Sequence, residues 1–217
     1  MESELKSGTG LNVTEKKQEI KVPPGELGAV LELIVRNKKG EITQRQAMRS
    51  RSFVKQFLQG LWLFAAYRYF NWPVMMKRTD ATEIAVTLYQ NDWECNAAAN
   101  SDTYGILVGM GTTAPTIDDY DMETKIAHGV GAGQLQYSAV TFGAPTEDGT
   151  VSHFTITRDF SNASGAAVTV REIGLVVRFY DTSGPSAHNF LTIRDAVNIT
   201  VPNGETLTVN YRIQATV

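Results

Sequence analysis

Apolar and polar side chains alternate without a break through residues 207–217. The apolar positions are Leu207, Val209, Tyr211, Ile213, Ala215 and Val217. Because successive side chains of a strand point to opposite faces, this pattern predicts a strand with one buried face. A strand of this kind needs neighbouring strands, so the segment most constrains the chain toward a β-sheet fold.

Short strand patterns continue through the second half of the chain. The predicted strands are residues 82–90, 104–110, 136–142, 151–160, 167–180, 190–193, 197–201 and 206–217. Turn-forming residues separate several of them, as at Asp148-Gly149 and Pro202-Asn-Gly204. This spacing predicts a mainly β chain, with an antiparallel β-sandwich of jelly-roll or Ig-like type over residues 81–217. Strands and helices do not alternate, which argues against a parallel nucleotide-binding sheet.

Residues 1–42 differ from the rest in composition and are predicted to form an extended N-terminal arm. Lys, Glu, Gly and Ser dominate, and Pro23-Pro24-Gly25 forms a stiff corner. A short apolar run over residues 30–35 ends at Asn37-Lys-Lys-Gly40, which indicates a small hairpin. Because isolated hairpins are marginal in water, we expect this one to join a sheet, either its own or a neighbour's.

Residues 43–80 contain the best helix candidate. Phe53, Phe57, Leu61 and Phe64 follow helical spacing and form an apolar stripe. Asn71-Trp-Pro73 is expected to end the helix, because proline restricts the residue before it and lacks an amide donor. The stripe is predicted to pack on the β-domain or on a neighbouring copy.

Composition excludes several classes of protein. The chain has 217 residues, a net charge of −3 and a single cysteine, Cys95. This charge is too small to favour nucleic acid as a partner, and one cysteine cannot form an intrachain disulfide. The first residues lack the order of a signal peptide. The most apolar run, 57–70, is too short and too polar to span a bilayer, so no membrane partner is expected.

One ordered set of motifs goes beyond a generic β-domain. It comprises Tyr104-Gly-Ile-Leu-Val-Gly-Met-Gly-Thr-Thr-Ala-Pro-Thr116, Asp118-Asp-Tyr-Asp-Met-Glu-Thr-Lys-Ile-Ala-His-Gly129, Phe154-Thr-Ile-Thr-Arg-Asp-Phe-Ser-Asn162, Val170-Arg-Glu-Ile-Gly-Leu175, Phe190-Leu-Thr-Ile-Arg-Asp195 and Gly204-Glu-Thr-Leu-Thr-Val-Asn-Tyr-Arg-Ile213. This succession resembles a domain of tailed-bacteriophage virion proteins, including tail-fibre, collar and neck-type components. The resemblance covers about residues 104–217. It implies a non-enzymatic building block of a phage particle.

The same residues also allow local predictions. Gly174, inside an apolar strand, indicates a bulge or a bulky side chain lying over the backbone. Residues 118–126 are compatible with a short helix that places Met122 and Ile126 on one face. Arg194 and Asp195 are expected to end a strand with an exposed local ion pair.

Catalytic and ligand-binding patterns are incomplete. Residues 109–116 lack the Lys and Ser/Thr of a phosphate loop, so no nucleotide cofactor is predicted. The acidic run 118–123 lacks the central Gly and closing Glu of a calcium loop, which favours a solvated acidic turn over a metal site. The three histidines, His128, His153 and His188, show neither zinc spacing nor a nucleophile with its base. We therefore predict no catalytic residues.

A basic stretch and an aromatic cluster are the remaining candidates for partner contact. Basic residues recur between 36 and 55, and aromatic residues between 62 and 72. Without aromatic residues among the basic ones, a single-stranded nucleic-acid platform is not supported. The predicted oligomer and partner contacts are Val30, Leu31, Leu33, Ile34, Arg49, Arg51, Phe53, Phe57, Leu61, Phe64 and Trp72.

These observations predict a structural component of a tailed-phage virion, located in the particle after assembly in the host cytoplasm. The chain would form a symmetric homo-oligomer and contact other virion proteins of the neck, collar, tail, fibre or capsid. Three alternatives stay open: a receptor- or glycan-binding spike or fibre module with recognition loops at 143–150 and 181–189, a capsid decoration protein, and a polysaccharide-cleaving enzyme. An enzyme of that kind would need paired carboxylates in a cleft.

Overall fold

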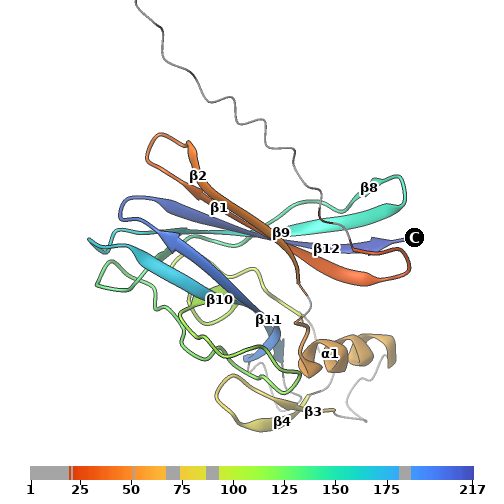
Figure 1. Cartoon of the computed structure of the whole chain (residues 1–217). Coiled ribbons are helices and arrows are strands. Elements are labelled where there is room, and N and C mark those ends of the chain that lie inside the picture. Colours follow the sequence, from red (N-terminus) through yellow and green to blue (C-terminus); the bar gives the residue numbers. More distant parts are fainter. Residues whose placement is uncertain (1–19, 21, 51, 67–73, 87–92, 181–186) are drawn as a thin grey trace, which may run out of the picture.

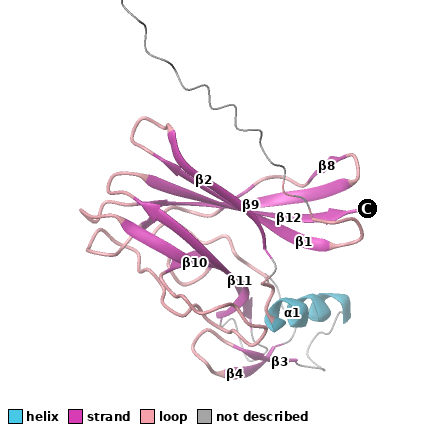
Figure 2. Cartoon of the chain, in the orientation of Figure 1, coloured by secondary structure: helices cyan, strands magenta, loops and turns pink. Residues whose placement is uncertain are grey.

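The computed structural model describes residues 20, 22–50, 52–66, 74–86, 93–180 and 187–217 (Figure 1). Strands dominate these residues, and one helix interrupts them (Figure 2). In chain order the elements are β1 (Leu27–Arg36), β2 (Ile42–Ser50), α1 (Lys55–Ala66), β3 (Val74–Lys77), β4 (Glu83–Val86), β5 (Gly105–Gly109), β6 (Gln136–Tyr137), β7 (Thr141–Phe142), β8 (Thr146–Asp148), β9 (Val151–Ser161), β10 (Val168–Tyr180), β11 (Ala187–Val201) and β12 (Thr206–Thr216).

Two antiparallel sheets pack face to face, which confirms the predicted mainly β fold (Figures 1 and 2). The larger sheet has the order β2-β1-β12-β9, and the short strands β6, β7 and β8 pair along the far side of β9. The smaller sheet has the order β11-β10-β5. Apolar side chains from both inner faces form one core, and the hydroxyl group of Tyr211 crosses it to donate to Asp195 Oδ2 at 2.9 Å.

Each predicted strand contains strand residues, but several boundaries change. The predicted strand 136–142 is divided into β6 and β7, and residues 87–90 of the predicted strand 82–90 lie outside the described residues. Segments 190–193 and 197–201 belong to the single strand β11, which pairs with β10 from Ala187 to Val201. The register shifts between Leu175 and Val176, where β11 carries Thr192 as an extra residue. A β-carbon built on the adjacent Gly174 would lie 3.1 Å from Met122 Sδ, so a bulky side chain covers the backbone there, as predicted.

The predicted boundaries of the arm and the helical segment need correction. Residues 27–36 form β1, which lies between β2 and β12 inside the chain's own sheet, and residues 43–50 belong to β2. The reason is that β1 is apolar on both faces: Leu31 and Leu33 enter the core, while Val30 and Ile34 are buried on the outer face. Such a strand is stable only inside a sheet. Residues 1–19 of the predicted arm lie outside the described residues.

The hairpin predicted at residues 37–40 joins β1 to β2. Asn37 organises it, because its side-chain Oδ1 accepts hydrogen bonds from the backbone N–H groups of Lys39 (2.9 Å) and Glu41 (3.1 Å). Gly40 adopts φ 81°, a left-handed conformation that glycine tolerates best. Sequence and structure agree on this turn.

The C-terminal strand, β12, forms as predicted, but its burial pattern reverses near its end. Leu207, Val209 and Tyr211 are buried in the core, whereas further along Gln214 is buried and Ala215 is exposed. The outer face is covered there by the segment that precedes β1, since Arg212 Nη2 donates to the carbonyl oxygen of Ile20 at 3.1 Å. β12 therefore buries one face as far as Tyr211 and the opposite face from Gln214 onward.

Helix α1 packs beside β11 and the β3–β4 hairpin (Figure 1). Its inward side consists of Gln56, Gly60 and Leu63, all buried. The glycine is required because a β-carbon at position 60 would lie only 2.1 Å from Trp93 Cζ3. Trp93 in turn stacks edge-on against Phe179 of β10. Close packing against Trp93 therefore fixes α1 on the smaller sheet.

Candidate functional site

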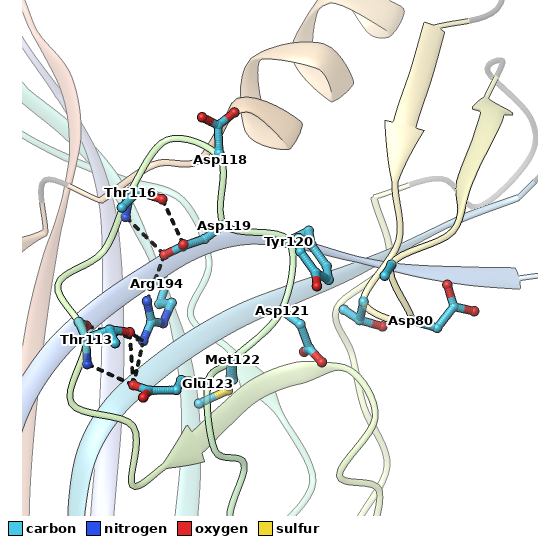
Figure 3. Close-up of a pocket in the computed structure, with 12 residues that line it drawn as sticks. Asp80, Thr113, Thr116, Asp118, Asp119, Tyr120, Asp121, Met122, Glu123 and Arg194 are labelled. Carbon is cyan, nitrogen blue, oxygen red and sulfur yellow. Dashed lines mark hydrogen bonds and ion pairs between the residues drawn. The ribbon is translucent and has the colours of Figure 1, made fainter.

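Four of the motif segments singled out in the sequence, including the one that contains it, meet around one buried arginine, Arg194 of β11 (Figure 3). Its Nε donates to Glu172 Oε2 of β10 at 2.8 Å, and its Nη1 donates to Asp119 Oδ2 at 2.8 Å. Nη2 donates to Thr113 Oγ1 at 3.0 Å. Arg194 and Glu172 are 2 % and 1 % exposed. The predicted exposed pair of Arg194 with Asp195 is therefore wrong, since Arg194 is buried and its carboxylate partners come from other segments.

Glu172 also holds the backbone of the loop formed by residues 110–124. Its Oε1 accepts hydrogen bonds from the N–H groups of Gly111 (3.1 Å) and Thr124 (2.7 Å), and its Oε2 accepts one from Glu123 (3.1 Å). A β-carbon on Gly109 or Gly111 would lie 2.5 Å from Oε1. Both glycines are therefore needed for the backbone to approach this carboxylate.

Two further carboxylates fold the 110–124 loop back on itself. Glu123 Oε2 accepts from the N–H groups of Thr112 (2.6 Å) and Thr113 (2.8 Å), while Asp119 accepts from the Thr116 N–H at 3.0 Å. The helix predicted at 118–126 does not form, and this was a wrong prediction. The reason is that these side chains bind the backbone N–H groups in a non-helical path.

The hydrogen bonds to Asp119 and Glu123 shift the pKa values of both carboxyl groups. Partial burial acts to raise the pKa of Asp119, but hydrogen bonds from Thr116 and Arg194 outweigh it, so the pKa is lowered. The pKa of Glu123 is also lowered, chiefly by the hydrogen bond from the Thr113 backbone. Asp121 behaves differently, because desolvation raises its pKa. The loop therefore depends on ionised Asp119 and Glu123.

An open hollow with a volume of ≈ 640 Å³ separates this loop from the turn between β3 and β4 (Figure 3). Its lining consists of Thr79, Asp80, Ala81, Thr113, Thr116, Asp118, Asp119, Tyr120, Asp121, Met122, Glu123 and Arg194. Within the described part of the chain, no three His, Cys, Asp or Glu side chains are placed to hold a metal ion. Asp119, Glu123 and Arg194 are already bonded to one another or to the loop, so the hollow is chiefly a product of loop architecture.

A second buried arginine was missed at the level of sequence. Arg158 of β9 is 0 % exposed, and its hydrogen bonds go to backbone carbonyl oxygens. The acceptors are Ser138 (2.9 Å), Tyr104 (3.2 Å), Ile106 (2.9 Å), Ala98 (3.2 Å) and Ser101 (2.5 Å). Burial lowers the pKa of this guanidinium to about 10. Strand alternation could have indicated it, because Arg158 shares a face with Ile156 and Phe160.

Cys95 is buried, and burial raises the pKa of its thiol to about 12. A thiol with this pKa stays protonated near neutral pH and is a weak nucleophile. The sequence interpretation of Cys95 as a small buried hydrophobe therefore agrees with its place in the core.

The predicted partner contacts separate into four groups. Val30, Leu31, Leu33 and Ile34 are buried within the sheet of their own chain, which removes them as surface contacts. Arg49 forms an ion pair with Glu26, and the rings of Phe53 and Phe57 contact each other at a tilt, with centroids 4.4 Å apart. Leu61 and Phe64 are exposed on α1. Arg51 and Trp72 lie outside the described residues.

The outward side of α1 is unusually apolar. Leu58, Leu61 and Trp62 are 62 %, 45 % and 46 % exposed, and with Ala65 they form one helical stripe at the spacing i, i+3, i+4, i+7. Phe64 borders it, and Met75 of the neighbouring β3 is also exposed. We call Leu58, Leu61, Trp62, Phe64 and Ala65 the α1 apolar face. A face of this kind marks an interaction surface more often than a solvated one.

The helices of the described residues include none long and apolar enough to cross a membrane. In comparisons with protein-family models, curated proteins and solved structures, nothing matches this chain. The phage resemblance therefore rests on the sequence motifs, and the function must be argued from the structure and these motifs together.

Proposed function

We propose that the chain is a structural component of a tailed-phage virion, assembled as a homo-oligomer in which the α1 apolar face contacts a neighbouring copy. Partners would be other copies and adjacent virion proteins of the neck, collar, tail or fibre. The virion assignment comes from the motif set, and the mode of assembly comes from the surface of α1.

The motif set is supported by how its members interact. Thr113, Asp119 and Glu123, from the first two motifs, bond to Arg194 of the fifth or to each other, and Glu172 of the fourth bonds to Arg194. Arg158 of the third donates to the carbonyl oxygen of Ile106 in the first, and Tyr211 of the sixth donates to Asp195 of the fifth. All six motifs are thus connected by hydrogen bonds into one unit. A unit of this kind specifies one loop conformation, which is the property expected of a structural building block.

The α1 apolar face is the single observation that supports self-association. The inward side of the helix already packs on β11 and β3, so its outward leucines and tryptophan contribute nothing to the described core. Leaving large apolar side chains in water forgoes about 1.5–3 kcal/mol for each residue that burial would stabilise. Contact with another protein surface would recover this free energy.

Measuring the mass of Trp62→Glu and Leu61→Glu by light scattering tests the contact. Each variant is expected to have a lower mass than the wild-type oligomer at the same concentration, because a buried charge opposes association. Phe142→Glu is the matched control, since Phe142 is 50 % exposed on β7, outside the α1 apolar face. An unchanged mass in both α1 variants, or a monomeric wild-type chain, would refute this contact.

The virion assignment has a separate test. Quantitative mass spectrometry of purified particles is expected to find the chain at a fixed copy number per particle. Its absence from particles that are otherwise complete would refute the assignment while leaving self-association untouched.

One observation favours a second function, a receptor- or glycan-binding module. Residues 141–150, which include the predicted loop 143–150 and the short strands β7 and β8, are exposed throughout. Exposed loops on a rigid scaffold commonly carry recognition. Exchanging 143–150 for a Gly-Ser loop should abolish binding to host cells if this function holds, and unchanged binding would exclude a role for the loop.

A further inference from the structure

The edges of the smaller sheet are closed by other parts of the chain. Beyond β5, the Ile126 N–H donates to the carbonyl oxygen of Val108 at 2.9 Å. Beyond β11, the Val54 N–H donates to Thr192 at 3.0 Å, and the Arg194 N–H donates to Ser52 at 3.1 Å. Irregular segments therefore bond to both outer strands, which leaves little of either edge open to another chain.

The rest of the β11 edge is closed by side chains of β2. Gln44 Nε2 donates to the carbonyl oxygen of Thr200 at 2.7 Å, and Gln46 Nε2 donates to that of Asn198 at 2.8 Å. These two amides connect the larger sheet to the smaller one along one side of the sandwich. As a result, β2 is fixed on its inner face.

The outer face of β2 is fixed as well. Arg45 forms an ion pair with Glu32 of β1, and Arg49 forms one with Glu26. Together with the two glutamines, these contacts hold the side chains of β2 on both faces. The strand is therefore positioned before any partner arrives, which lowers the entropy cost of binding.

The free edge of β2 differs from the other edges of the two packed sheets. Over the described residues, β2 pairs with β1 alone, and its nine residues form the long uncovered edge of the larger sheet (Figure 1). On the opposite edge, β9 is covered by β6, β7 and β8. Proline and lysine, which commonly protect such edges, do not occur in residues 42–50. The strand is thus a template for β-augmentation.

We propose that β2 pairs antiparallel with β2 of a second copy, with Gln46 facing Gln46 across a two-fold axis. The inference rests on the proposed homo-oligomer and names a second contact within it. Charge selects the register: Arg45 then faces Ala47, and Arg49 faces Thr43. A shift of two residues in either direction would place Arg45 opposite Arg45 or opposite Arg49, and like charges directly opposite are destabilising.

Cysteine cross-linking tests both the pairing and its register. Cβ atoms of directly opposed residues lie about 4.5–5.5 Å apart, whereas diagonal neighbours lie about 7–8 Å apart. Gln46→Cys is therefore expected to form a disulfide-linked dimer on mild oxidation. Ala47→Cys is the matched control, because residue 47 faces residue 45 and not itself. Native Cys95 is buried and adds little background.

The expected result is about tenfold more covalent dimer for Gln46→Cys than for Ala47→Cys, because a disulfide tolerates little departure from its ideal geometry. Equal yields, a higher yield for Ala47→Cys, or no dimer from either variant would overturn the proposal. Circular dichroism of both variants checks that the sheet is intact, and a repeat with Gln46→Ser excludes oxidation elsewhere.

The same cross-link separates this inference from the proposed function. In a Leu61→Glu background the α1 contact is disrupted, but β2 is unchanged, so cross-linking of Gln46→Cys should persist. If the wild-type chain is oligomeric by light scattering and the Gln46→Cys variant does not cross-link, the β2 pairing alone fails. If the wild-type chain is monomeric and the Gln46→Cys variant also gives no covalent dimer, both contacts fail.

Discussion

Two arginines are buried, Arg158 in the larger sheet and Arg194 in the smaller one, and their guanidinium groups donate to different kinds of acceptor. Arg194 bonds to the carboxylates of Glu172 and Asp119. Arg158 bonds to five backbone carbonyl oxygens, and no carboxylate of the described residues lies within ion-pair distance of it. The positive charge of Arg194 is therefore balanced by carboxylate charges, and that of Arg158 by carbonyl dipoles.

The two kinds of acceptor should give the two sites different responses to pH. Carbonyl oxygens cannot titrate and the pKa of Arg158 is about 10, so the Arg158 site should be insensitive to pH below neutrality while it fixes residues 98–106 and Ser138. Carboxylates can be protonated, so the Arg194 site should respond to pH. The predictions that follow test this contrast, beginning with the largest expected effect.

Arg158→Met is expected to lower the free energy of unfolding by about 4–5 kcal/mol, because it leaves several buried carbonyl oxygens without a donor. Urea denaturation at neutral pH measures this loss. Arg158→Lys should restore little of it, because one ammonium group cannot reach acceptors arranged around a planar guanidinium. A loss below about 1 kcal/mol in Arg158→Met would show that water replaces the guanidinium.

Arg194→Met should lower the free energy of unfolding by about 2–3 kcal/mol at neutral pH. The loss is smaller because Glu172 keeps its three backbone N–H donors. Arg194→Met also removes a hydrogen bond that lowers the pKa of Asp119, so the difference in stability between this variant and the wild-type chain should become smaller as the pH falls below about 3.9. Urea denaturation across this range checks the sign. Arg158→Met should show no such narrowing, and a narrowing in both variants would remove the contrast.

Asp119→Asn should lower stability by about 1–2 kcal/mol at neutral pH, because it weakens the bonds to Arg194 and Thr116. The folded-state pKa of Asp119 lies below its ordinary value, so its contribution is present above about pH 3.9 and is lost as the pH falls further. The gap between wild type and variant should therefore close in acid. Asp121, whose pKa is raised, acts in the opposite direction. A gap that is constant with pH would contradict this account.

Arg45→Gln should have the smallest effect, below about 1 kcal/mol, because its ion pair with Glu32 is partly exposed. The measurement is urea denaturation at low and high salt, where added salt should remove most of the difference. This variant gives the baseline against which the two buried arginines are compared. A loss as large as that of Arg194→Met would show that burial is not what distinguishes them.

Periodicity predicted much of this fold, because alternation depends only on local geometry. It identified β12 and the segments that become β9, β10 and β11. For residues 27–36 it predicted a hairpin that joins a sheet, but not that this strand is apolar on both faces and lies between two others. Such a strand needs partners on both sides, and β12, the partner of β1, lies at the far end of the chain.

The site was harder to predict, because it depends on contacts between distant segments. Glu172 and Arg194 carry no local signal of burial, since each is stabilised by groups from the 110–124 loop. The outward stripe of α1 was partly visible, because Leu61 was predicted as a contact residue. The stripe predicted from Phe53 to Phe64 is nevertheless divided: Phe57 packs near Trp93, whereas Leu61 points to solvent.

The place of β1 has a consequence for biosynthesis. Leu31 pairs with Tyr211, a residue made about 180 positions later. At roughly 5–20 residues per second, a ribosome needs about 9–36 s to cover that distance. During this interval the β1–β2 hairpin has emerged without the strand that covers its other edge. Nascent chains on one polysome would expose this apolar segment to each other, so chaperone binding early in translation should govern the yield of native protein.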